Sequence, residues 1–260
     1  PETPIMRATV STGGTAYKVA VVDSFAFVAN GYEGFAVVNV KDPLEPRLIG
    51  SVDTPGYAHD VAVAGNYAYV PDWDRGMKVV DVTNPSAPRI VTAIATDGYA
   101  SAVTVSGEYV YVVGTGGHLT IVNVADPQQP QIVGSVTNAG SAAVFVAGKY
   151  AYVGGTGLRI FDVSNPANPK RVGGIVSTEL TDIQVVGTTA YLSDRYGGLI
   201  AADVSNPALI KPRFSVQTVR GARAVAIVEQ HAFLSIGDVA SPWTGVQVVD
   251  IEKLEAPPSI

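Results

Sequence analysis

The chain has 260 residues, of which 47% are hydrophobic and 15% are charged, with a net charge of -6 and no cysteine. This composition predicts a sizeable apolar core, and the scattered Lys and Arg argue against nucleic acid, whose phosphates require clustered basic residues. The lack of cysteine excludes disulfides, cysteine-ligated metals and thiol catalysis. No apolar run approaches the roughly 20 residues that a membrane-spanning helix needs.

One phrase recurs along the chain with small variations. Its copies are FAVVNVKDPLEP (35–46), MKVVDVTNPSAP (77–88), LTIVNVADPQQP (119–130), LRIFDVSNPANP (158–169), LIAADVSNPALIKP (199–212) and VQVVDIEKLEAP (246–257). The Asn or Asp before the last Val or Ile of the apolar run marks each copy, and the markers lie 42, 42, 39, 41 and 47 residues apart at Asn39, Asp81, Asn123, Asp162, Asp203 and Asp250. A period of about 40 residues indicates a repeat architecture.

Each repeat has the pattern of a small β-meander. Residues 65–91 contain three short β-patterned runs joined by two turns. Pro85 and Pro88 bracket the second turn, and proline cannot donate to a strand ladder, so the chain must leave the sheet there. Several strands per repeat, without a helical pattern, predict the blade of a β-propeller.

The motif [VI]-x-[VI]-[ND]-V-x-[ND]-P-x-x-P, followed by an apolar strand and then V-x-V-x-G-x-x-A-[YF]-V, resembles the LVIVD repeat family. The resemblance covers essentially the whole chain. It implies a β-propeller, and it implies a surface or exported protein without shared catalytic residues.

We therefore predict an all-β protein that forms a six-bladed β-propeller of four-stranded antiparallel blades in a single domain over residues 1–260. The expected blades are residues 15–57, 58–99, 100–140, 141–180, 181–221 and 222–260, the last completed by 1–14. Residues 1–14 match the second half of a repeat, and the C-terminal copy stops where an outer strand should follow. We expect residues 6–11 to supply that strand and to close the ring.

Features that recur in every repeat are interpreted as scaffold. The paired aromatics of the second strands, such as Tyr67 and Tyr69, are expected to pack in the core, because a single site does not need a copy in each blade. The Asn-Pro and Asp-Pro turns are expected to use their short polar side chains to satisfy turn N–H groups.

Sites are expected where the repeats differ, in the turns between second and third strands and in the segments that lead into the first strands. The first, second, fifth and sixth blades carry nearly all the charged and aromatic residues of these loops, which predicts one lopsided ligand site over the channel mouth. The candidate ligand-binding residues are Tyr17, Lys18, Tyr32, Glu33, His59, Asp60, Asp72, Trp73, Asp74, Arg75, Asp182, Asp194, Arg195, Tyr196, Arg223 and Trp243. The competing interpretation is a set of solvated turns with local ion pairs, such as Asp194 with Arg195.

We expect no catalytic residue and no metal or other cofactor, with two alternatives left open. Asp60, Asp182 and His59 could serve a hydrolase or lyase as acid and base, although neighbours on a strand point to opposite faces. Asp72 and Asp74, joined by Asp60, could hold calcium through oxygen ligands.

The predicted function is a noncatalytic recognition, adhesion or scaffold module of an exported or cell-surface protein. Its expected partner is a polypeptide or a glycan, bound at one face near the channel mouth. Flanking domains of a longer surface protein are a further expected partner, and an extracellular or cell-surface location is expected.

Overall fold

The computed structural model describes residues 6–237 and 245–254, in which β-strands predominate and one short 3-10 helix, η1 (Glu252–Leu254), occurs. None of the helices in this described part is long and apolar enough to cross a membrane. Contacts divide the chain into two compact units, Pro1–Asn138 and Ala139–Ile260. A single domain over 1–260 stays a prediction.

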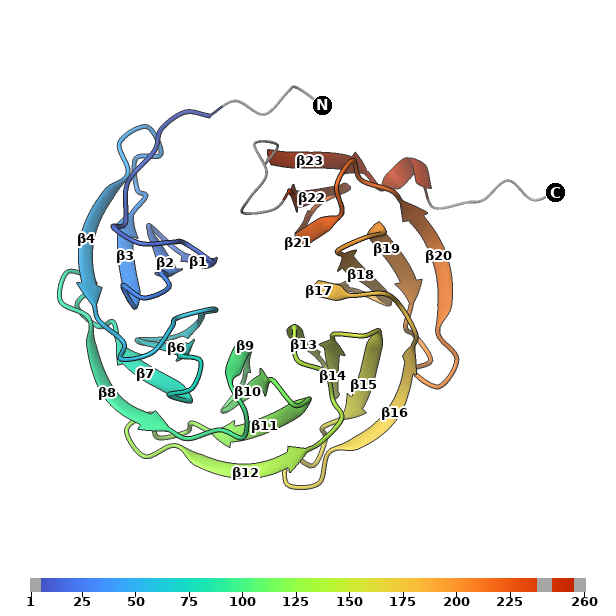
Figure 1. Ribbon diagram of the computed structural model, residues 1–260, viewed down its shortest axis with the longest axis horizontal. Coiled ribbons are helices and arrows are strands. Elements are labelled where there is room, and N and C mark those ends of the chain that lie inside the picture. Colours follow the sequence, from blue (N-terminus) through green and yellow to red (C-terminus); the bar gives the residue numbers. More distant parts are fainter. Residues whose placement is uncertain (1–5, 238–244, 255–260) are drawn as a thin grey trace. The chain divides into compact units, whose positions relative to one another are not determined.

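The first unit contains three four-stranded antiparallel sheets in which consecutive strands pair. In Figure 1 their first strands lie nearest one another and their fourth strands form the outer margin of the unit. The sheets are β1 (Lys18–Val22), β2 (Phe25–Ala29), β3 (Phe35–Asn39) and β4 (Arg47–Val52); β5 (Ala62–Ala64), β6 (Tyr67–Pro71), β7 (Met77–Asp81) and β8 (Arg89–Ile94); and β9 (Ala100–Ser106), β10 (Tyr109–Gly114), β11 (His118–Asn123) and β12 (Gln131–Val136).

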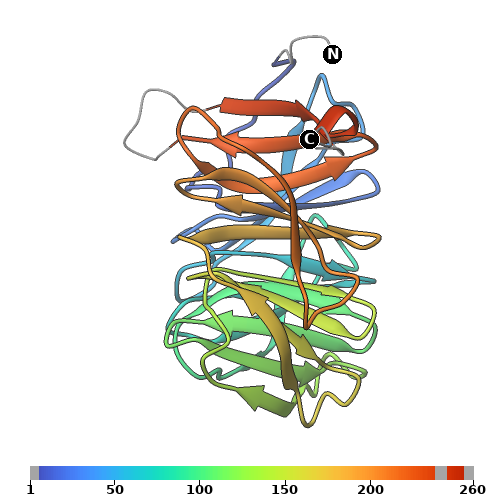
Figure 2. The same cartoon turned by 90° about the vertical axis from the view of Figure 1, so that its right-hand side faces the viewer.

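The second unit repeats this plan in two four-stranded sheets and a third sheet with three described strands. Figure 2 shows these twisted sheets lying one above another. They are β13 (Ala143–Ala147), β14 (Tyr150–Gly154), β15 (Leu158–Asp162) and β16 (Lys170–Ile175); β17 (Leu180–Val186), β18 (Thr189–Asp194), β19 (Gly198–Asp203) and β20 (Lys211–Val216); and β21 (Ala222–Val228), β22 (His231–Ile236) and β23 (Gly245–Asp250).

Each predicted blade thus contains one antiparallel sheet, and the all-β, six-bladed propeller fold is confirmed. Ring closure by the N-terminal strand is not confirmed, because described residues 6–17 form no strand and β23 has no fourth strand beside it in the described part of the chain. Val10 instead packs within the first unit against Ala26, Val28, Ala36 and Val38. That closure stays a prediction.

The second and third strands of the blades form the core. A large apolar residue at the first or second position of the third strand is almost fully buried in five blades, at Phe35, Met77, Leu119, Leu158 and Leu199. The second aromatic of each pair is also buried, as predicted, at Phe27, Tyr69, Tyr111 and Tyr152, and so is the single Tyr191 of the fifth blade, whereas Phe233 of the sixth blade is exposed. Burial raises the pKa of Tyr69 to about 12, which fits a phenol that packs in the core.

The Asx residues of the recurring phrase build the turn after the third strand, as predicted. Asp81 accepts the Thr83 N–H at 2.9 Å, and Asn84 accepts the Ser86 N–H at 3.2 Å. The marker residues Asn39, Asn123, Asp162 and Asp203 make the same bond to the N–H two residues on. The repeated polar residues are therefore backbone partners of a turn.

Candidate functional site

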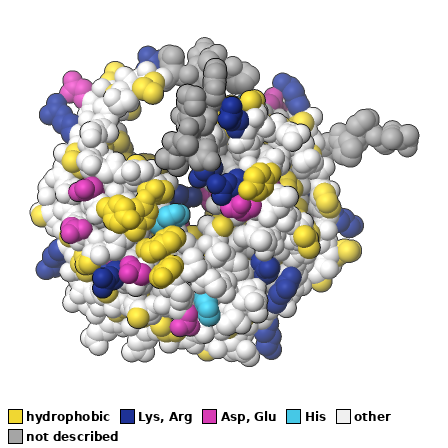
Figure 3. Space-filling model, in the orientation of Figure 1, with side chains coloured by type: hydrophobic (Ala, Val, Ile, Leu, Met, Phe, Trp, Pro, Cys, Tyr) yellow, Lys and Arg dark blue, Asp and Glu magenta, His cyan; other side chains and the backbone are white. Residues whose placement is uncertain are grey.

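Six aromatic side chains gather on one face of the first unit. We call Tyr17, Tyr32, Tyr57, His59, Trp73 and Tyr99 the aromatic cluster. Tyr57 is central, with ring centroids 5.2 Å from Tyr17, 4.5 Å from Tyr32 and 6.4 Å from Trp73. Trp73 extends the cluster to Tyr99, its stacked neighbour at 5.4 Å. Figure 3 shows hydrophobic side chains gathered beside a histidine on this face.

The repeat explains how these residues converge. Tyr17 and His59 are 42 residues apart and occupy the same position at the start of successive blades, as do Tyr57 and Tyr99. Tyr17 and His59 stack with ring centroids 5.1 Å apart. Equivalent positions of successive blades thus lie side by side. In the first three blades, one or both of these positions hold an aromatic side chain.

Trp73 enters the cluster through an unusual backbone conformation. Its φ is 52°, in the left-handed region that bulky side chains rarely adopt. The carbonyl of Trp73 accepts the Ala100 N–H at 3.0 Å, which holds the β6–β7 turn against the first residue of β9. That contact brings Tyr99 over the indole ring.

The aromatic cluster lines a cavity of about 690 Å³ on the surface of the first unit. Tyr32 is 80% exposed and Tyr17 is 40% exposed, while Tyr57, His59 and Trp73 are half-buried. The lining residues are Tyr17, Tyr32, Pro55, Gly56, Tyr57, His59, Trp73, Asp74 and Arg75. The cavity therefore combines large ring surfaces with a few polar groups, the composition typical of ligand sites.

Charged groups border this cavity. Asp74 and Arg75 face each other at 3.8 Å and are both more than half exposed, so their attraction is weak. Glu33 follows Tyr32 and is exposed, and no cation of the described residues lies within ion-pair distance of it. Lys18 begins β1 and contributes positive charge near His59.

His59 is fixed as a neutral ring. Its Nδ1 lies 3.0 Å from the Ser101 carbonyl oxygen, and because a carbonyl can only accept, Nδ1 carries the proton. Burial lowers the pKa of His59 below 6.5, opposed by the Ser101 bond and assisted by the Lys18 charge. The Nε2 atom is consequently a hydrogen-bond acceptor at neutral pH.

The phenols of Tyr17 and Tyr57 are joined by a hydrogen bond from the Tyr57 hydroxyl to the Tyr17 hydroxyl. Burial, followed by this bond and the nearby tyrosines, raises the pKa of Tyr57. The Tyr57 phenol therefore remains protonated at neutral pH, and the Tyr17 hydroxyl, which accepts its hydrogen bond, has an O–H group of its own to donate.

Asp60 and Asp182 occupy equivalent positions and accept equivalent pairs of backbone hydrogen bonds. Asp60 accepts the N–H of Val61 at 2.8 Å and that of Val103, on the first strand of the next blade, at 2.9 Å. Asp182 accepts the N–H of Ile183 at 3.0 Å and that of Val225 at 3.2 Å. Each carboxylate thus ties its blade to the following one, and acid/base chemistry would compete with that role.

Asp72 and Asp194 are almost completely buried within their turns. Asp72 accepts the Gly56 N–H at 3.0 Å and lies 3.4 Å from the Lys78 ammonium, yet burial raises the pKa of its carboxyl. Asp194 accepts the N–H groups of Tyr196 and Gly197 together with hydroxyl bonds from Ser177 and Thr178. Burial opposes these bonds, and the net effect is to lower the pKa of Asp194. Both carboxylates hold loops in place.

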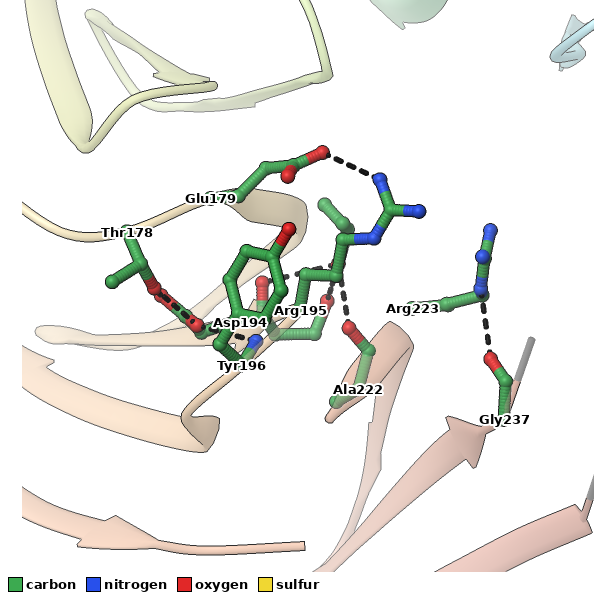
Figure 4. Close-up of polar contacts among 10 residues, drawn as sticks. Thr178, Glu179, Asp194, Arg195, Tyr196, Ala222, Arg223 and Gly237 are labelled. Carbon is green, nitrogen blue, oxygen red and sulfur yellow. Dashed lines mark hydrogen bonds and ion pairs between the residues drawn. The ribbon is translucent and has the colours of Figure 1, made fainter. Parts of the chain in front are cut away.

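The second unit has a cavity of its own, of about 610 Å³. It is lined by Arg195, Tyr196, Val219, Arg220, Gly221, Arg223 and Gly237. Arg195 pairs with Glu179 at 3.0 Å, and the Arg223 Nε donates to the Gly237 carbonyl at 2.8 Å. Figure 4 shows both arginines projecting to the same side. This cavity is cationic, in contrast to the aromatic cavity of the first unit.

The predicted site residues therefore fall into separate groups. Within the first unit one cavity collects Tyr17, Tyr32, His59, Trp73, Asp74 and Arg75, and within the second another collects Arg195, Tyr196 and Arg223. Trp243 lies outside the described residues. One site shared by these groups stays a prediction.

Sequence reasoning missed Tyr57 and Tyr99 as candidates. The signal that could have identified them is that both tyrosines occupy the same position of the repeat, 42 residues apart, in the segments that lead into the first strands of two successive blades. Among the described residues, no group of three or more His, Asp or Glu side chains is arranged to hold a metal ion. Calcium at Asp60, Asp72 and Asp74 stays an open alternative.

Comparisons with known proteins agree with the repeat. The LVIVD repeat profile matches residues 13–54, 55–96, 97–138, 139–178 and 179–218. No curated protein matches the chain. A solved structure that resembles it is the crystal structure of the computationally designed Ika8 protein, with 12% sequence identity and a TM-score of 0.69 over 91% of this chain and 71% of that one. At that identity the likeness shows the fold alone.

Proposed function

This chain belongs to the LVIVD repeat family, and we propose that it is a noncatalytic recognition module whose first unit binds a polypeptide or a glycan through the aromatic cluster. A propeller fold is compatible with many functions, so the proposal rests on the site. Exposed Tyr and Trp side chains are the residue types enriched in binding hot spots.

The observation that carries the proposal is the conformation of Trp73. A large side chain at φ 52° costs free energy that a glycine would avoid. Strain of this kind persists where the surrounding structure enforces it, and it concentrates at ligand sites. Here the strained backbone places the indole in the half-exposed cluster beside Tyr57 and Tyr99.

The location is part of the proposal. We infer that the module acts outside the cell or on its surface, as the family resemblance implies, joined to flanking domains where its chain is longer. Antibody labelling of intact cells that produce the protein tests this location. Signal that appears only after permeabilisation would contradict it.

Binding is tested by fluorescence of the Trp243→Phe variant, in which Trp73 is the remaining tryptophan. A panel of synthetic peptides and oligosaccharides is titrated into it, and we expect at least one probe to give a saturable change. Calorimetry with Trp73→Ala should show that binding is lost, whereas Tyr196→Ala, an exposed tyrosine of the second unit, should bind normally. Equal binding by both variants would contradict the assignment to the first unit.

A further inference from the structure

Several rings of the aromatic cluster stand at steep angles to one another. Tyr57 is inclined by 63° to Tyr17, by 80° to Tyr32 and by 71° to Trp73, so neighbouring rings meet edge to face. Trp73 and Tyr99 stack at 16°, which covers one face of the indole. A sugar needs an open, flat ring face to lie on. A pyrrolidine ring can instead pack against steeply inclined aromatic rings, which is how proline-rich segments dock in aromatic-lined grooves.

The aromatic cluster also presents hydrogen-bond donors. The indole N–H of Trp73 has no acceptor among the described residues, and the Tyr17 hydroxyl, which accepts the Tyr57 proton, keeps a proton to donate. A polyproline II segment has no internal hydrogen bonds, and its carbonyl groups are solvated. Such a segment supplies the acceptors that these donors lack.

Both acidic and basic side chains border the cluster, and its two carboxylates, Asp74 and Glu33, have no strong ion pair among the described residues. Asp74 lines the cavity and has only a weak exposed contact with Arg75, and Glu33 stands beside Tyr32 without a cation among the described residues. The whole chain carries a charge of -6. These carboxylates complement a basic side chain on the ligand, and complementary charge improves orientation and the rate of association.

We propose that the aromatic cluster binds an extended, proline-rich peptide that carries a Lys or Arg beside its prolines. The prolines enter the cavity and pack on the Tyr57 and Trp73 rings that line it. The Trp73 indole N–H donates to a peptide carbonyl, and the basic residue faces Asp74 or Glu33. This inference rests on the proposed function and specifies the ligand of the same site.

The test uses the full chain as Trp243→Phe and a synthetic peptide of eight prolines preceded by one arginine. Matched probes replace every second proline by alanine, or arginine by glutamate, and chitohexaose serves as the glycan. We expect saturable binding of the proline peptide, and weakening by about tenfold when prolines are lost, as for removal of a central contact. The glutamate peptide should also bind more weakly.

Two variants separate the parts of the proposal. Trp73→Phe keeps an aromatic ring and removes the N–H, and calorimetry should show about threefold to tenfold weaker binding, the range for one hydrogen bond. Asp74→Asn combined with Glu33→Gln should reduce the preference for arginine over glutamate. Thermal unfolding of each variant checks that the fold is retained.

The outcomes are distinct. Chitohexaose binding that depends on Trp73, without peptide binding, overturns the proline-peptide inference and leaves the recognition proposal standing. Equal affinity for the proline and alanine peptides also overturns it. Failure of every peptide and glycan probe contradicts both proposals.

Discussion

Trp73 and Gly31 occupy equivalent positions in successive blades and share one backbone conformation. Their φ values are 52° and 65°, and each forms an isolated β-bridge to the alanine that opens the next blade, Ala100 and Ala58 respectively. Glycine adopts this conformation without steric cost, whereas tryptophan does not. The second blade therefore accepts a strained residue where the first has a relaxed one.

The strain at Trp73 predicts an unusual order of stability. Trp73→Gly should be about 1 kcal/mol more stable than Trp73→Ala, because the Cβ of alanine retains the penalty of positive φ. Urea unfolding of both variants measures the difference. Gly31→Ala is the matched control and should cost a similar amount, since its new Cβ would meet no heavy atom closer than 3.4 Å. Alanine at 73 equal to or more stable than glycine would contradict the assignment.

The carboxylates that connect blades predict a stability defect. Asp60→Ala and Asp182→Ala should each lower the free energy of unfolding by about 2 kcal/mol or more, because each removal leaves two backbone N–H groups without their acceptor. The exposed Asp74→Ala should change it by at most about 0.5 kcal/mol. Chemical denaturation compares the three. Stable Asp60 and Asp182 variants would reopen a catalytic interpretation of these groups.

The Asx turns predict acid sensitivity. Hydrogen bonds from Thr83 and then Arg89 lower the pKa of Asp81 to about 2, from an ordinary value of 3.8. The ionised form therefore stabilises the fold above pH 3.8, and this contribution is lost as pH falls toward 2. Asp81→Asn should show a smaller drop in urea midpoint between pH 4.5 and pH 2.5 than the wild type. Asn123→Asp, at the equivalent turn, should show a larger one.

The neutral state of His59 predicts a second pH dependence. Its pKa is lowered from 6.5, so the folded protein resists protonation, and stability falls as pH drops below 6.5. His59→Gln should remove that component of the stability profile between pH 7 and pH 5. Ligand affinity should change only at a lower pH, below the lowered pKa of His59 in the folded protein, where a charged ring would replace an acceptor in the cluster. An unchanged profile in the variant would assign the dependence to another group.

The repeat made the fold predictable from the sequence. Its period predicted one antiparallel meander per repeat. Residues equivalent to Tyr69 and Asp81 recur in other repeats, which marked these two as core and turn residues, and the structure confirms both. The site was predicted less completely, because the repeat pattern does not show which loops of neighbouring blades contact one another. Tyr99 lies beside Trp73 because the Trp73 carbonyl accepts a hydrogen bond from the N–H of Ala100, the next residue, in the following blade. That contact depends on packing between blades, which no single repeat encodes.

The burial of certain carboxylates could not be predicted from the sequence pattern either. Asp60 and Asp72 resemble exposed loop carboxylates in the sequence, yet both are buried and accept backbone N–H groups. Their partners lie in other segments, such as Val103 and Gly56. The distinction between a ligand-binding and a loop-fixing carboxylate therefore required the fold.

The most direct test of ligand binding by the aromatic cluster is calorimetric titration of the arginine-proline peptide and chitohexaose into wild type, Trp73→Ala and Tyr196→Ala. We predict that wild type and Tyr196→Ala bind the same probe with equal affinity and that Trp73→Ala does not bind it. Binding that survives Trp73→Ala but is lost in Tyr196→Ala would place the ligand on the second unit and contradict the site described above.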